Sequence, residues 1–114
     1  MHELGIASAI LDAVRKEAEL HGSGHVSKVT VRVGALSGVE PEALSFGFDA
    51  LVKGTDLDPL VLEIVRVPRR QRCPDCELTF EASEDSLACP RCSNEATILA
   101  GGEELDLAYL EVED

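Results

Sequence analysis

Apolar residues recur at helical spacing in two stretches of the chain. Between residues 4 and 22 they fall every three or four positions, which predicts an amphipathic helix that ends at Gly22. A second helix is predicted to begin at Pro41, a residue favoured in a first turn, and to end before Gly54. The apolar positions of the two helices are Ala7, Ile10, Leu11, Val14 and Ala18, and Leu44, Phe48, Leu51 and Val52.

Three other stretches have the pattern of strands. Residues 25–36 alternate valine with polar residues, which predicts a strand with one packed face. Residues 60–67 are apolar and β-branched between two prolines, and residues 105–112 form the third predicted strand. The order helix, strand, helix, strand, insertion, strand predicts an α+β fold, with two helices packed on a small sheet of about three strands. The order of the strands within the sheet does not follow from the sequence.

An insertion separates the second predicted strand from the third. It spans residues 68–104, and Gly101 and Gly102 allow the chain to turn back into the sheet. We therefore expect two lobes: residues 1–67 with 105–114 form an α/β lobe, and residues 68–104 form a smaller lobe. A length of 114 residues is consistent with one small domain that carries such a lobe.

All four cysteines lie in the insertion, in two C-x-x-C pairs. CPDC contains Cys73 and Cys76, CPRC contains Cys89 and Cys92, and 12 residues separate the pairs. This spacing is typical of a four-thiolate zinc ribbon, in which each pair forms a turn that reaches one tetrahedral metal. Because the protein fills all four positions, no position is open for substrate or water, and we expect the zinc to be structural.

Other uses of the paired cysteines are less consistent with the sequence. A redox pair needs one C-x-x-C at the start of a helix, and structural disulfides are uncommon in a chain without a secretory leader. An iron site of the rubredoxin type usually has glycine where Glu77 and Ser93 stand. The basic residues Arg69, Arg70 and Arg72 are interpreted as a solvated edge that offsets thiolate charge, with a docking patch for an acidic partner as the alternative.

The charge balance argues against some classes of function. Ten Lys and Arg residues against 22 Asp and Glu residues give a net charge of −12, which repels a phosphate backbone. No segment is long and apolar enough to cross a membrane, and no leader precedes the first helix, so we expect a cytoplasmic protein. No pairing of a nucleophile with a base is identifiable, and we therefore expect neither an enzyme nor a protein that binds nucleic acid or membrane.

The first three residues, MHE, can chelate a second metal. The Met1 amine, the His2 amide nitrogen and the His2 imidazole close a five-membered and a six-membered ring in one plane. Such a planar nitrogen set favours Ni(II) or Cu(II) over Zn(II), and copper should bind at least as tightly as nickel. The alternative is that His2 is an exposed residue at a frayed end. His21 and His25 are interpreted as surface residues at a turn.

Four segments together resemble the HypA/HybF family of hydrogenase maturation factors. They are MHELGIASAIL, VRVGALSGVEPEALSFGFDALVKGT, the two cysteine pairs and GGEELDLAYLEVE, in the same order and over essentially the whole chain. The resemblance implies a nickel metallochaperone that binds Ni(II) transiently at its N-terminus and helps insert it into a [NiFe] hydrogenase large-subunit precursor. It also implies a HypB-type GTPase as a partner, nickel bound by Met1, His2 and Glu3, and structural zinc bound by the four cysteines.

This chain departs from some members of that family. No histidine follows His25, whereas some members offer nickel a further histidine from the zinc lobe. The fourth nickel donor therefore stays open among Glu3, Glu40, water and a partner residue. The oligomeric state, monomer or homodimer, is also open. A zinc-ribbon interaction module without nickel function is the alternative from another class.

Overall fold

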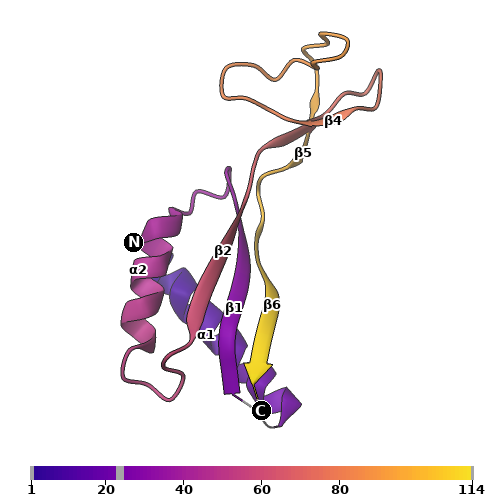
Figure 1. The fold of residues 1–114 in the computed structure, drawn as a ribbon. Coiled ribbons are helices and arrows are strands. Elements are labelled where there is room, and N and C mark those ends of the chain that lie inside the picture. The colour runs from indigo at the N-terminus through magenta and orange to yellow at the C-terminus, as the bar shows by residue number, and fades with distance from the viewer. Residues whose placement is uncertain (1, 23–24, 114) are drawn as a thin grey trace.

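A three-stranded sheet carrying two helices on one face forms the larger part of the computed structural model, which describes residues 2–22 and 25–113 (Figure 1). A second three-stranded sheet extends from its end and makes the molecule long, with extents of 53 × 29 × 15 Å. The elements are α1 (His2–His21), β1 (His25–Gly34), α2 (Pro41–Val52), β2 (Val61–Val67), β3 (Arg70–Arg72), β4 (Thr79–Glu81), β5 (Ile98–Gly101) and β6 (Leu105–Glu113). The predicted α+β class is confirmed.

The strand order of the first sheet is β2-β1-β6, which places β1 in the centre. β1 pairs with β2 in parallel, and the chain between them forms α2, whereas β1 pairs with β6 in antiparallel. The sequence could not give this order, because β6 reaches β1 only after the whole insertion.

The two faces of this sheet differ as the alternation in β1 predicts. Val29, Val31 and Val33 are almost fully buried beneath the helices, within the hydrophobic core. On the opposite face, Arg32 donates two hydrogen bonds to the carboxylate of Asp106, at 2.8 and 2.7 Å. The helices therefore cover one face of the sheet, and a charged network covers the other. Neither described helix is long and apolar enough to cross a lipid bilayer.

The smaller lobe, residues 68–104, contains a sheet of its own with the order β4-β3-β5. The hydrophobic pattern of the sequence predicts no strand within these residues. The sheet was missed because β3 is the polar segment RQR, which shows no apolar alternation. Its central residue, Gln71, is only 2% exposed and donates to the hydroxyl of Thr97 at 3.0 Å. A buried hydrogen bond thus holds this sheet where an apolar contact is usual.

Two glycines allow the lobes to join. The N–H of Gly34 donates to the carbonyl of Glu104 at 2.7 Å, and the N–H of Leu36 donates to the carbonyl of Gly102 at 2.6 Å. A Cβ atom on Gly34 would overlap the Gly102 carbonyl, and Gly102 itself has φ +116. The backbone at this junction is therefore too close-packed to admit a side chain.

We predict that Gly34→Ala lowers the free energy of unfolding by roughly 1–3 kcal/mol, because the added methyl group must displace the backbone of the junction. Gly5→Ala is the matched control. A Cβ on Gly5 has no heavy atom within 4 Å, so this variant should be neutral or more stable. Urea denaturation of both variants measures the difference, and equal stability of the two would contradict the proposed role of the close approach.

Candidate functional site

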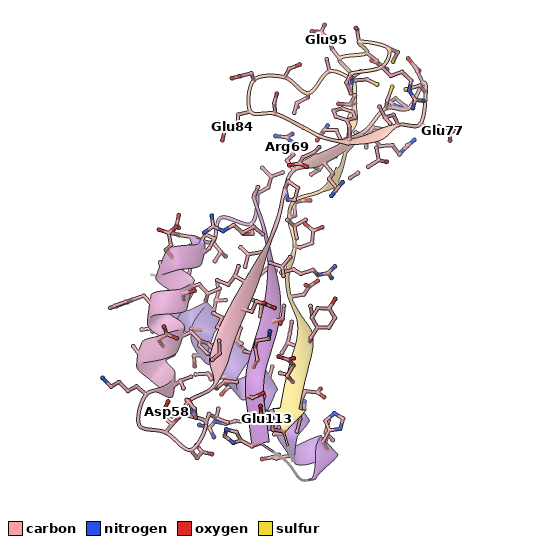
Figure 2. All side chains as sticks on the ribbon, in the orientation of Figure 1. Asp58, Arg69, Glu77, Glu84, Glu95 and Glu113 are labelled. Carbon is pink, nitrogen blue, oxygen red and sulfur yellow. The ribbon has the colours of Figure 1, made fainter. Side chains whose placement is uncertain are left out.

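The four predicted metal ligands lie together in the smaller lobe. The sulfur atoms of Cys73, Cys76, Cys89 and Cys92 all lie within 4.8 Å of one another. Those of Cys73 and Cys92, and those of Cys76 and Cys89, are 3.5 Å apart, and all four thiols are free. A tetrahedron with Zn–S bonds of about 2.3 Å has edges of about 3.8 Å, so the donor set fits one zinc ion. Figure 2 shows these sulfur atoms in the smaller lobe, on the side of Glu77.

Each cysteine pair is shaped by the same backbone turn. The first cysteine turn comprises residues 73–78, and the second comprises residues 89–94. In both turns, the residue after the second cysteine donates its N–H to the carbonyl of the first cysteine at 2.8 Å. That residue is Glu77 or Ser93, with φ of 61 or 65, the left-handed conformation that usually favours glycine. The turn therefore forms with residues other than glycine at this position.

Without a metal, the four thiols compete for negative charge. The backbone N–H groups of Cys76 and Asp75 stabilise the thiolate of Cys73 and lower its pKa to about 6. The N–H of Asn94 favours the thiolate of Cys92, but the contact with Cys73, burial and the neighbouring sulfurs of Cys89 and Cys76 together outweigh it and raise the pKa of Cys92 to about 12. A divalent cation removes this competition because it neutralises adjacent thiolates.

Burial also suits a structural ion. In each pair the first cysteine is buried, with Cys73 0% and Cys89 2% exposed. The second cysteine is more accessible, since Cys76 is half-buried and Cys92 is exposed. A metal at this position would thus be held from the interior of the lobe by the first cysteine of each turn. The second cysteine of each turn would lie on its solvent side.

The residues of the predicted nickel site lie in the other lobe. Met1 lies outside the described residues, whereas His2 and Glu3 form the first turn of α1. Nε2 of His2 is 3.3 Å from the carbonyl oxygen of Gly38, and the side chain is 63% exposed. The Glu3 side chain is only 14% exposed, and its Oε2 accepts the N–H of Glu40 at 3.2 Å. The start of α1 is therefore tied to the loop that precedes α2.

Glu40 lies beside the other predicted nickel residues, but its carboxylate has another partner. Oε1 accepts the N–H of Glu42 at 3.3 Å, as the cap of α2 requires. Sequence reasoning missed Gly38, because a backbone carbonyl contact over 36 positions leaves no local signal. The remaining histidines, His21 and His25, are exposed at the far ends of their elements.

The chain is similar to known proteins over nearly its full length. A family model described as hydrogenase/urease nickel incorporation, metallochaperone, HypA matches residues 1–112. The hydrogenase maturation factor HypA of Acidithiobacillus ferrooxidans is 38% identical over 113 residues, which cover 99% of this chain and 100% of the relative. The hydrogenase maturation factor HybF of Morganella morganii is 35% identical over 113 residues, with the same coverage.

Solved structures agree in fold. The solution structure of the Ni metallochaperone HypA from Helicobacter pylori matches with a TM-score of 0.66 and 23% identity, covering 99% of this chain and 98% of that one. A second solution structure, of a HypA protein, matches with a TM-score of 0.71 and the same identity, covering 98% and 96%.

We predict that zinc binding to the metal-free protein releases protons. The pKa of Cys73 is about 6, so this thiol is mostly ionised at neutral pH, whereas Cys76 and Cys92 are protonated because their pKa values are raised. At about pH 7, binding should release at least about two protons, and the affinity should rise about a hundredfold per pH unit. Calorimetry in two buffers of different protonation enthalpy counts the protons. An affinity that stays constant between about pH 6 and 8 would contradict the four-thiolate site.

Proposed function

Because the chain belongs to the HypA family of hydrogenase/urease nickel-incorporation metallochaperones, we propose that it binds Ni(II) at its N-terminus and delivers it to a [NiFe] hydrogenase large-subunit precursor. The observation that carries the proposal is the placement of His2 and Glu3 against the loop before α2. A HypB-type GTPase is the proposed nickel-handling partner. Transfer then proceeds by exchange of ligands, without a catalysed reaction.

The contact of His2 with Gly38 supports the proposed chelate. If Nε2 carries the ring proton and donates it to the Gly38 carbonyl, the lone pair of Nδ1 is directed to the metal. Nδ1 is the atom that closes a six-membered ring with the His2 amide nitrogen. That amide lies in the first turn of α1, where backbone N–H groups have no partner within the helix, so a metal can replace its proton without breaking the helix. The Met1 amine completes the three nitrogens of the proposal.

Glu3 is the proposed acidic member of the nickel site. The positive end of the α1 dipole opposes a bound cation, and the carboxylate of Glu3 offsets that field. Its Oε2 lies 3.6 Å from Nε2 of His2, so it stands beside the imidazole. Glu40 is the weaker additional candidate, because ligation by its carboxylate would compete with the cap of α2.

We also propose zinc as the structural ion of residues 68–104. The described hydrophobic core cluster consists of residues from α1, α2, the first sheet and the loops between them, and it includes none from the smaller lobe. A lobe of this size without an apolar core needs another source of stability, which a four-thiolate zinc supplies. The same observation supports the division into an α/β lobe and a zinc lobe at residues 68–104.

We predict that His2→Ala lowers Ni(II) affinity at least about tenfold, because it removes one ligand and even outer-sphere partners are worth about that much. Residues added before Met1 should have the same effect, since they convert the amine to an amide. His21→Ala is the matched control, because this histidine is exposed at the other end of α1. Nickel titration of untagged protein measures the affinities. Unchanged binding in the first two variants, with zinc retained, would favour the zinc-ribbon interaction module instead.

We predict a graded effect of substitutions at Glu3. Glu3→Gln keeps an oxygen for the N–H of Glu40 but removes the negative charge, so Ni(II) affinity should fall about fivefold. Glu3→Ala removes the tether as well and should bind still more weakly. Glu19→Gln, an exposed position on the same helix, controls for overall charge. Equal affinity in all variants would exclude a role for Glu3, and nickel titration at low ionic strength gives the most sensitive comparison.

A further inference from the structure

The two cysteine turns share the same backbone hydrogen bonds, and one of the side chains in which they differ reaches across to the other turn. In each turn the N–H of the first cysteine donates to the carbonyl of the residue two positions after the second cysteine, at 2.9 Å. That residue is Leu78 in the first turn and Asn94 in the second. At this position, therefore, the first turn has an apolar side chain, and the second turn has an amide that can reach the metal ligands.

The side chain of Asn94 crosses from its own turn to the other one. Its Nδ2 donates to Oδ2 of Asp75 at 2.9 Å and lies 3.8 Å from Sγ of Cys73 as a donor. Its Oδ1 accepts the N–H of Ala96 at 2.8 Å. Each polar atom of the amide thus has a partner, and both contacts of the nitrogen are made to the first cysteine turn.

The geometry points to Asn94 as a positioning residue of the four-cysteine site, one that donates to the Cys73 sulfur and holds the two turns together around the metal. This inference rests on the proposed zinc at these cysteines. Thiolates bound to zinc carry excess negative charge, and an N–H donor to sulfur stabilises that charge and fixes the direction of the ligand. Cys73 is the fully buried ligand, so no water is available to replace the amide. The Leu78 side chain offers no such donor to the second turn.

Asn94→Asp tests this role with little change in shape. The carboxylate keeps an acceptor for the N–H of Ala96, so the local turn is retained, but both contacts to the first turn lose their donor. We expect the zinc affinity of this variant, measured by competition with a chelator, to be about 10–100-fold lower than that of the native protein. Glu95→Gln, at the exposed next residue, is the control and should behave as the native protein.

A second variant separates the bond to sulfur from the bond between side chains. Asn94→Asp combined with Asp75→Asn exchanges the amide and the carboxylate, so residues 75 and 94 can bond again with reversed polarity. The sulfur of Cys73 still lacks its donor and faces a carboxylate. We expect zinc affinity to stay low and the sulfur-to-metal absorption of the Co(II)-loaded full-length protein to shift to longer wavelength, because a sulfur without its donor gives up electron density more readily.

The outcomes distinguish the two levels of inference. If the native protein binds no zinc, the proposed structural zinc is wrong. If the native protein binds zinc and Asn94→Asp binds it equally well, the role of Asn94 is overturned. Full recovery of affinity and of the Co(II) spectrum in the double variant would overturn the bond to sulfur and leave only the bond between the turns.

Discussion

Pairing of β1 with a strand on each of its edges is the constraint on which both candidate metal sites depend. The core closes because the valines of β1 lie under α1 and α2. β2 and β6, held by β1, lead the chain into and out of the smaller lobe. The loop that follows β1 contacts both the smaller lobe and the start of α1. The N–H of Leu36 bonds to the carbonyl of Gly102 at the junction, and the carbonyl of Gly38 contacts His2. One loop is therefore adjacent to both lobes.

The contacts that form the two sites differ in their separation along the chain, and this separation decides which of them could be predicted from the sequence. The cysteine turns use bonds over four or five positions, so the C-x-x-C spacing predicts the cluster directly. The proposed chelate at His2 is equally local in its ring sizes. Its surroundings are not, because the bonds to Gly38 and Glu40 span 36 and 37 positions. The spacing of apolar residues predicts the helices and the strands of the first sheet, whereas the polar strand around Gln71 has no such pattern.

The two proposed donor sets differ in the metal ion that they prefer. Four sulfurs in the smaller lobe match the preference of zinc for tetrahedral, soft ligands, while the nitrogens of the proposed chelate at the start of α1 match the planar preference of nickel. The proposed carrier needs an ion that leaves and an ion that stays. An exposed imidazole at the edge of one lobe and two buried cysteines in the other fit those opposite requirements.

The chain enters and leaves the smaller lobe through the two strands that flank β1, and this has a thermodynamic consequence. Both ends of the segment 68–104 are held by β1, so this segment is a closed loop of 37 residues whether or not it is ordered. The entropy cost of bringing the loop ends together, which grows only as the logarithm of loop length, is met when the first sheet forms. The four cysteines then come together within a segment whose ends are already held close by the first sheet. Loss and recapture of the metal can therefore proceed while the larger lobe stays folded.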